Sequence, residues 1–236
     1  MNILVQFPTY SRPQKFVNVL NQYVETCSDK HEIFFNINCD SDDLTMQDKS
    51  VVNQIHSTLN AKSNVTGAIW FDKNTNKISA INDHIDGMDF DIVICASDDM
   101  IPKAWSWDVE IANAMQQHFP DLDGCVHFND GNTNGDLITF SILGKKLYEH
   151  FGYIYHPDYK SLYCDDEFTQ EVRGMGKEKY INKIIIKHEH YGEEGNSNSG
   201  DFDASAQKTL RYAGRDQVVF NRRRELGFPK QKITND

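Results

Sequence analysis

The stretch ICASDDMIP, residues Ile94 to Pro102, decides the fold, because an apolar segment runs directly into two adjacent carboxylates and then into a proline. The segment DFDIVICA, residues 89–96, overlaps the start of this stretch and is apolar enough for a buried strand. Two interpretations of Asp98 and Asp99 follow. They hold a divalent cation, or they belong to a solvated turn that caps a helix beginning near Pro102.

Strands and helices alternate on both sides of this stretch. Apolar runs predict strands over residues 2–7, 32–38, 65–71 and 182–190. Apolar residues at helical spacing predict helices over residues 14–27, 46–59, 77–88, 104–119 and 165–176, and a helical tail from residue 204. This alternation predicts an α/β fold with a largely parallel sheet covered by helices on both faces. The polar loops after the strands are then expected to converge at the carboxyl edge, where open α/β sheets bind ligands.

Composition restricts the class of protein. The chain has 236 residues, 39% of them hydrophobic and 25% charged, which fits one unit of catalytic size. No apolar run approaches the ~18 residues that span a bilayer, and the first residues lack the features of a signal peptide, so an intracellular, cytoplasmic protein is expected. Five scattered cysteines without a CxxC pair argue against a disulfide framework and a zinc ribbon. The motifs GxGxxG, GxxxxGK[ST], GxSxG and HExxH are missing, which disfavours dinucleotide enzymes, P-loop NTPases, α/β hydrolases and zincins.

Charge is distributed unevenly. The net charge is −11, yet residues 208–232 hold eight basic and two acidic residues, so that this window carries +6. The acidic body disfavours a polyanionic partner. The basic tail has two interpretations: it pairs with the acidic body, or Arg222, Arg223 and Arg224 neutralise the phosphates of a polyanion.

Two further groups of residues carry chemistry. His188 and His190 alternate along a predicted strand and therefore point to one face, as metal ligands or as ordinary strand-end histidines. The motif CDDEF places Asp165, Asp166 and Glu167 at the start of a predicted helix, where a carboxylate acts as a general base or only complements the helix dipole.

Taken in order, these motifs resemble the GT-A glycosyltransferases, especially the family 2-like branch. The resemblance covers roughly residues 1 to 190. ILVQFPTYSRP is similar to that family's first strand and turn, NCDSDD to the acidic turn after its second strand, and NKISAIN to its next helix. ICASDDMIPKAW resembles the DxD strand end, with Ser97 in place of the first aspartate, while CDDEF and KHEH resemble the acceptor-side acidic motif and the C-terminal metal-ligand histidine.

The resemblance implies an enzyme of the glycosyltransferase class (EC 2.4) that uses a nucleotide sugar, first a UDP-sugar, with Mn²⁺ or Mg²⁺ as cofactor. An inverting displacement is expected, with a glycan or a lipid-linked sugar as acceptor. The basic tail adds a polyanionic alternative, a hydroxymethylated DNA base. Carried over residue by residue, the donor site comprises Pro8, Thr9, Tyr10 and Arg12 at the nucleotide, Asp40 or Asp42 at the base or ribose, Lys77 and Asn82 near the diphosphate, and Asp98 at the donor sugar or ribose. Asp99 is the expected metal ligand, completed by His188 or His190, and Asp166 is the expected catalytic base.

The resemblance also divides the chain. Residues 1–191 form the GT-A-like domain, with a nucleotide-sugar-binding half over 1–101 and an acceptor half over 102–191, and residues 192–236 form a glycine- and serine-rich loop followed by the basic helical tail. Two alternatives stay open: a non-catalytic domain that binds nucleotide sugars or carbohydrates, and a nucleotidyltransferase. Against the nucleotidyltransferase, this chain lacks the glycine-rich basic loop that such an enzyme needs after its first strand.

Overall fold

The computed structural model describes residues 1–189 and 204–231. The strands of its main sheet are β1 (Asn2–Thr9), β2 (Glu32–Asp40), β3 (Val65–Asp72), β4 (Ile92–Cys95), β6 (Cys125–Phe128), β7 (Ile142–Gly144) and β8 (Glu178–Ile181). A separate pair consists of β5 (Met100–Pro102) and β9 (Ile186–His188). The helices are α1 (Pro13–Thr26), α2 (Lys49–Leu59), α3 (Lys77–Asn82), α4 (Trp107–His118), α5 (Lys145–Phe151), α6 (Cys164–Gly174), α7 (Ala204–Leu210) and α8 (Ala213–Glu225).

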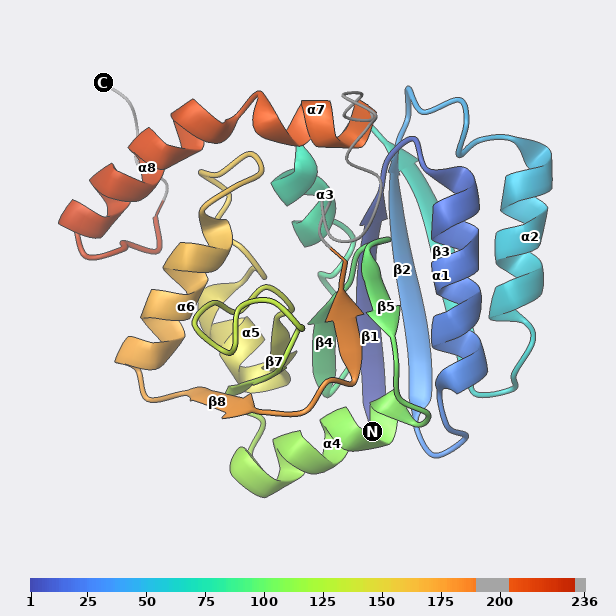
Figure 1. Cartoon of the computed structure of the whole chain (residues 1–236), viewed down its shortest axis with the longest axis horizontal. Helices are drawn as coiled ribbons and strands as arrows, with labels where there is room; N and C mark the ends of the chain where they lie inside the picture. The colour runs from blue at the N-terminus through green and yellow to red at the C-terminus, as the bar shows by residue number, and fades with distance from the viewer. Residues whose placement is uncertain (190–203, 232–236) are drawn as a thin grey trace.

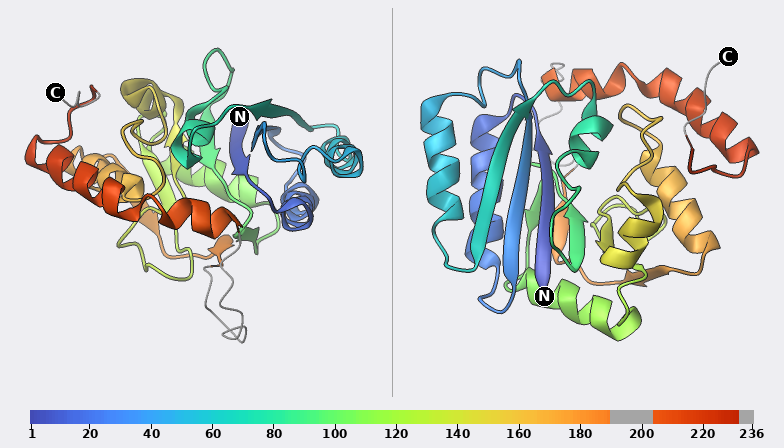
Figure 2. Two further views of the ribbon diagram at one scale, coloured as in Figure 1. Left: turned by 90° about the horizontal axis from the view of Figure 1, so that it is seen from above. Right: turned by 180° about the vertical axis from the view of Figure 1, so that it is seen from behind.

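The main sheet has the order β3-β2-β1-β4-β7-β6-β8 (Figure 1). The first four strands in this order pair in parallel, β8 is parallel to β6, and β7 is antiparallel to both of its neighbours. Helices cover both faces of the sheet (Figure 2). The predicted α/β fold with a mostly parallel central sheet is therefore confirmed.

Alternation along β1 separates two hydrophobic layers. Val5 and Phe7 point to one face and pack among apolar residues of α1, α2 and α4. Leu4 points to the other face and packs with apolar residues of α3, α5 and α6. Because successive strand side chains alternate between faces, a near-continuous apolar run is what a strand buried on both sides requires.

The interpretation of Asp98 and Asp99 as caps of a helix near Pro102 is wrong. Residues 100–102 form the short strand β5, and the next helix, α4, begins only at Trp107. Proline is compatible with this strand because it is the last residue of a three-residue strand in a two-stranded sheet. The two carboxylates therefore lie in a turn between two strands.

The C-terminal helices lie over the body of the protein. Helix α7 lies near the carboxyl end of the parallel strands, and α8 lies beside α6 (Figures 1 and 2). The predicted helical tail is thereby confirmed. No helix in the described ranges is long and apolar enough to cross a membrane.

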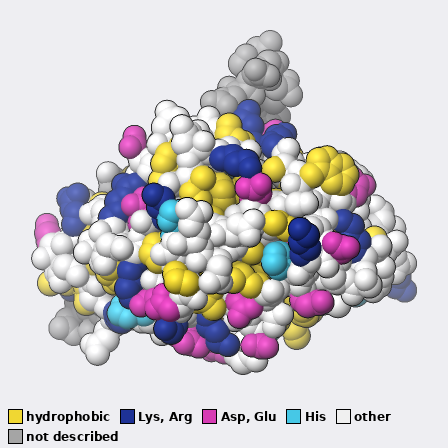
Figure 3. Space-filling model, turned by 90° about the horizontal axis from the view of Figure 1, so that it is seen from below, with side chains coloured by type: hydrophobic (Ala, Val, Ile, Leu, Met, Phe, Trp, Pro, Cys, Tyr) yellow, Lys and Arg dark blue, Asp and Glu magenta, His cyan; other side chains and the backbone are white. Residues whose placement is uncertain are grey.

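Arg223 of α8 joins the tail to the body. Its side chain is fully buried; Nε and Nη2 donate to the two carboxylate oxygens of Glu167, each at 2.8 Å, and Nη1 lies 3.0 Å from Asp158 Oδ2. Pairing of the basic tail with the acidic body is therefore correct for this arginine, and the alternative, in which Arg223 neutralises external phosphates, is wrong. On the face seen from below, basic and acidic side chains are likewise interleaved (Figure 3).

Arg223→Ala tests this link. It leaves the buried Glu167 carboxylate without its cation, and removing one partner of a buried pair costs about 3 to 5 kcal/mol. We expect a loss of that order in the free energy of unfolding, measured by urea denaturation. The exposed neighbour Arg224, replaced by alanine, serves as the control and should lose less than about 1 kcal/mol. Equal stability of the two variants would contradict the assignment.

Candidate functional site

A cavity of about 470 Å³ opens at the carboxyl edge of the sheet, where the loops after β1, β2 and β4 meet. Nine of the residues predicted for the donor and metal line it: Pro8, Thr9, Tyr10, Arg12, Asp40, Lys77, Asp98, Asp99 and His188. Three other predicted residues, Asp42, Asn82 and Asp166, are not among the residues that form its wall. His190 lies outside the described residues.

Asp98 binds back to the first turn of the chain. Its carboxylate accepts a hydrogen bond from Arg12 Nη1 at 2.8 Å and one from Thr9 Oγ1 at 3.2 Å, and the residue is only 4% exposed. Burial raises the pKa of Asp98, and the charge of Arg12 offsets part of that rise. The pair fixes the β1–α1 turn against the loop that follows β4.

Asp99 and His188 meet although 89 positions separate them. The antiparallel pair β5 and β9 sets Met100 opposite His188, and the backbone N–H of Glu189 donates to the carbonyl of Asp99 at 2.8 Å. His188 Nε2 then lies 3.5 Å from Asp99 Oδ1, and Ser97 Oγ donates to the same carboxylate oxygen. Burial alone would raise the pKa of Asp99, but the hydrogen bond and charge of His188 together with the Ser97 hydrogen bond hold it well below its usual range.

This arrangement fits a divalent cation. An ionised carboxylate oxygen and an imidazole nitrogen 3.5 Å apart are both within reach of one ion bound at about 2.0 to 2.2 Å from each. Both side chains are partly buried and line the cavity, which leaves the remaining coordination positions to water and to oxygens of a ligand. Ser97 orients Asp99 by its hydrogen bond.

Helix α3 presents Lys77 to the cavity. Asn76 caps this helix, with Oδ1 accepting from the Ser79 backbone N–H at 3.0 Å. Buried Gln6 donates to the carbonyl of Asp83 at 2.9 Å, just beyond the end of the helix. Asn82 accepts from two backbone N–H groups, those of residues 154 and 155, and donates to the carbonyl of residue 155. Asn82 thus connects α3 to the 154–155 segment.

Asp42 is exposed, whereas the adjacent Asp43 is buried and accepts the backbone N–H of Ser11 at 2.5 Å. Asp43 therefore holds the first turn of the chain in place. The sequence pattern did not distinguish these neighbours, because burial of one of two adjacent aspartates depends on which loop packs against them.

Of the two aspartates at the start of α6, Asp165 lines the cavity and Asp166 does not. Burial raises the pKa of Asp165, the charge of Asp166 raises it further, and Lys77 offsets part of the rise. Burial also raises the pKa of Asp166. A carboxyl group with a raised pKa beside a ligand cavity is suited to accept a proton.

The loop before α6 is held by Asp216 of α8, a fully buried residue that sequence reasoning missed. Its carboxylate accepts the backbone N–H groups of three consecutive cavity residues, Lys160, Ser161 and Leu162, at 2.7 to 3.2 Å. The Ser161 hydroxyl is buried and has no hydrogen-bond partner within the described part of the chain. The only sequence signal for Asp216 was an acidic residue within a basic helix.

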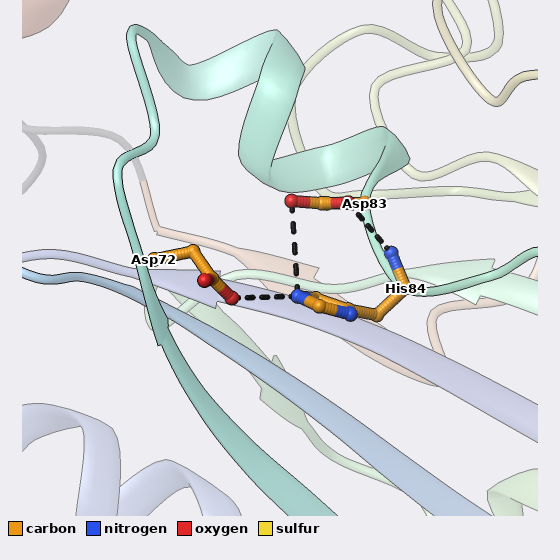
Figure 4. Close-up of side chains that lie close together, drawn as sticks. All are labelled: Asp72, Asp83 and His84. Atoms are coloured by element: carbon orange, nitrogen blue, oxygen red, sulfur yellow. Dashed lines mark hydrogen bonds and ion pairs between the residues drawn. The ribbon is translucent and has the colours of Figure 1, made fainter.

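A second group of potential metal ligands lies outside the cavity wall. Asp72 ends β3, and Asp83 and His84 follow α3; His84 Nε2 lies 2.7 Å from Asp72 Oδ2 and 3.8 Å from Asp83 Oδ2 (Figure 4). Within residues 1–189 and 204–231 it is the one group of three such side chains close enough to share an ion. The His84 ring also stacks on Trp70, with centroids 4.3 Å apart, so packing and ion pairing between β3 and this loop account for the cluster.

No known protein family and no curated protein matches this sequence. Solved structures do match. PcManGT, a mannosyltransferase from Pyrobaculum calidifontis in complex with GDP-Man and Mn²⁺, has a TM-score of 0.55 and 15% identity, over 77% of this chain and 54% of that chain. TarS residues 1–349 from S. aureus, in complex with UDP-GlcNAc, has a TM-score of 0.58 and 18% identity, over 86% of this chain and 62% of that chain.

These neighbours share the GT-A glycosyltransferase fold, and the chain described here has that fold. The chain spans between half and two thirds of the length of these two neighbours. At identities below 20% the likeness establishes the fold alone. Function must therefore be argued from the cavity and its side chains.

Asp216→Asn tests the loop attachment. An amide in place of the carboxylate removes the charge that strengthens the three N–H···O hydrogen bonds. It also turns into a donor either the oxygen that accepts these N–H groups or the one that accepts from Arg215 Nη1. We expect a loss of roughly 1 to 3 kcal/mol in unfolding free energy and faster amide hydrogen exchange at residues 160–162. The exposed control Glu225→Gln should leave both unchanged. Unaltered protection at residues 160–162 in Asp216→Asn would contradict the role of Asp216.

Proposed function

We propose that the chain is a metal-dependent glycosyltransferase that moves a sugar from a nucleotide-sugar donor to a hydroxyl acceptor. The observation that carries the proposal is the meeting of Asp99 and His188 in the same cavity that the predicted donor-binding residues line. The shared fold with proteins solved in complex with GDP-Man or UDP-GlcNAc supports a nucleotide-sugar donor.

The donor is proposed to bind along the cavity from Tyr10 to Lys77. Tyr10 and Asp40 offer a ring face and a hydrogen-bond acceptor to the nucleobase or ribose, and Lys77 offers a positive charge to the diphosphate. Pro8 and Thr9 complete the turn, while Arg12 and Asp98 act as a pair that shapes it. A UDP-sugar stays the first candidate and a GDP-sugar the second. Asp42 and Asn82 stay candidates from the sequence alone, because neither is part of the cavity wall.

Asp99 and His188 are the residues proposed to hold Mn²⁺ or Mg²⁺. A divalent cation bound there would neutralise negative charge that develops on the departing diphosphate. Asp99 is suited to this because its lowered pKa keeps it ionised at neutral pH. His190 stays a candidate from the sequence alone.

The proton transfer is assigned to α6. As the acceptor oxygen forms its bond to the anomeric carbon, the bond from that carbon to the donor phosphate oxygen breaks, and a carboxylate takes the acceptor's proton. The sequence favoured Asp166, but Asp165 is the better candidate because it lines the cavity. Attack from the side opposite the diphosphate would give an inverting reaction.

The acceptor is proposed to be a glycan or a lipid-linked sugar. A hydroxymethylated DNA base has weaker support, because Arg223 is buried in an ion pair and cannot meet phosphates. The donor half over residues 1–101, the acceptor half over 102–191 and the tail over 192–236 remain a proposed division. Asp216 attaches part of that tail to the cavity loop.

Nucleotide binding with Mn²⁺ is the first test. We expect isothermal titration to detect binding of UDP, or of GDP, and to show that Mn²⁺ strengthens it. Asp99→Asn should reduce the Mn²⁺-dependent affinity by about tenfold or more, since it removes a charged metal ligand. Asp42→Asn, an exposed carboxylate outside the cavity wall, is the matched control and should bind as the parent does. If Asp99→Asn keeps both the affinity of the parent and its dependence on Mn²⁺, the metal assignment is refuted.

Turnover is the second test, measured as hydrolysis of nucleotide sugars by the parent chain. Asp165→Asn should lower kcat by about 10² to 10⁴ while nucleotide affinity is kept, whereas Asp166→Asn should change kcat less than about tenfold. A base must be deprotonated, so activity should fall as pH decreases through the Asp165 pKa. Because burial raises that pKa, the fall should occur above the ordinary carboxyl value of about 3.9.

The reverse ranking of the two variants would return the role of the base to Asp166. Nucleotide-sugar binding without any hydrolysis or transfer would favour the non-catalytic domain. Release of pyrophosphate from a nucleoside triphosphate would favour the nucleotidyltransferase.

A further inference from the structure

Helix α7 forms part of the cavity wall. Its end lies near the carboxyl ends of β1 and β2 (Figure 1), where Lys208 contacts Asp40, the last residue of β2. Three consecutive residues at its end, Lys208, Thr209 and Leu210, line the cavity, and so does Tyr212, which precedes α8. The C-terminal segment therefore contributes directly to the site, on the side where the nucleoside of a donor is proposed to bind.

Lys208 makes the closest contacts of this segment. Its ammonium forms an ion pair with Asp40 Oδ2 and lies 3.9 Å from the centroid of the Tyr10 ring. The side chains of Lys208 and Asp40 are only 22% and 10% exposed, so both contacts are shielded from solvent. A partly desolvated cation on an aromatic face that also pairs with a carboxylate is held more strongly than a surface lysine.

The same two groups are the ones proposed to receive the nucleoside. A planar base needs the face of Tyr10 and hydrogen-bond capacity at Asp40, and an ammonium 3.9 Å above the ring leaves no room for a base on that face. We propose that Lys208 is a built-in competitor for the nucleoside subsite, which a donor displaces when it binds. This inference rests on the proposed function.

The consequence is that Lys208 lowers the affinity of the cavity for the donor. A binding site that is filled by a group of the same chain must be vacated before a ligand binds. The apparent affinity is then the intrinsic affinity multiplied by the fraction of molecules in which the site is open. A cation–π contact and a partly buried ion pair of ordinary strength predict a penalty of about 3- to 30-fold in the dissociation constant. Displacement of Lys208 also removes the ion pair that links α7 to Asp40.

The test compares the parent with Lys208→Met, which keeps the length of the side chain and removes the charge. Isothermal titration uses uridine and UDP, and guanosine and GDP, with the full chain. The nucleosides carry no phosphate, so they report the competition without the general attraction between a cation and a diphosphate. We expect Lys208→Met to bind the preferred nucleoside about 3- to 30-fold more tightly than the parent does.

Lys146→Met is the matched control, because Lys146 is an exposed lysine that pairs with Asp121 away from the cavity wall. It should bind as the parent does. Equal or weaker nucleoside binding by Lys208→Met, with binding by the parent intact, would overturn the competition and leave the proposed function standing. Absence of nucleotide and nucleoside binding in both the parent and the variant would overturn the proposed function, and this inference with it.

Amide hydrogen exchange gives a second readout that a merely structural lysine would not change. In the parent, saturating UDP or GDP should accelerate exchange at residues 204–210, because the donor releases α7. Slower exchange at these residues on nucleotide binding would contradict displacement.

Discussion

Parallel pairing of β1 with β2 on one side and β4 on the other is the constraint on which the site depends. The register sets Thr9 beside Cys39 and Gln6 beside Cys95, so the loops that follow all three strands emerge at one edge of the sheet. The residues of these loops are far apart in the sequence and close in space. The Arg12–Asp98 ion pair then joins the loop after β1 to the loop after β4, and it does so within a buried environment that strengthens the contact.

Much of this arrangement could be predicted from sequence, because apolar periodicity identifies strands and helices and a parallel sheet aligns their ends. The turn after β4 was harder. Pro102 was compatible with a helix start and with an edge strand, and only the pairing of β5 with β9 decides between them. The same long-range pairing sets His188 beside Asp99, whereas the sequence could say only that a histidine would follow an apolar strand.

The choice between neighbouring carboxylates was also beyond the sequence. Asp42 and Asp43 differ in burial, and Asp165 and Asp166 differ in access to the cavity, yet each pair is chemically identical along the chain. Side-chain direction at a helix start depends on the preceding loop, and that loop is fixed by Asp216, more than 50 residues later. No local pattern carries this information.

The contacts of the C-terminal tail explain why basic residues are concentrated there. Its cations and its buried Asp216 connect it to the body at several places. Among them are the contacts of Arg223 with Glu167, of Asp216 with the loop at 160–162, and of Lys208 with Asp40. A basic segment of an acidic protein thus holds the loop at residues 160–162 and forms part of the cavity wall. The cavity is consequently a product of both ends of the chain.

The central claim is that one divalent cation binds between Asp99 and His188 when a nucleotide occupies the cavity. A crystal structure of the chain with UDP or GDP and Mn²⁺, using the anomalous signal of manganese to locate the ion, tests it most directly. The account predicts manganese within coordination distance of an Asp99 carboxylate oxygen, of His188 Nε2 and of the diphosphate. Manganese bound elsewhere, or a nucleotide bound in the cavity with no ion touching Asp99, would contradict it.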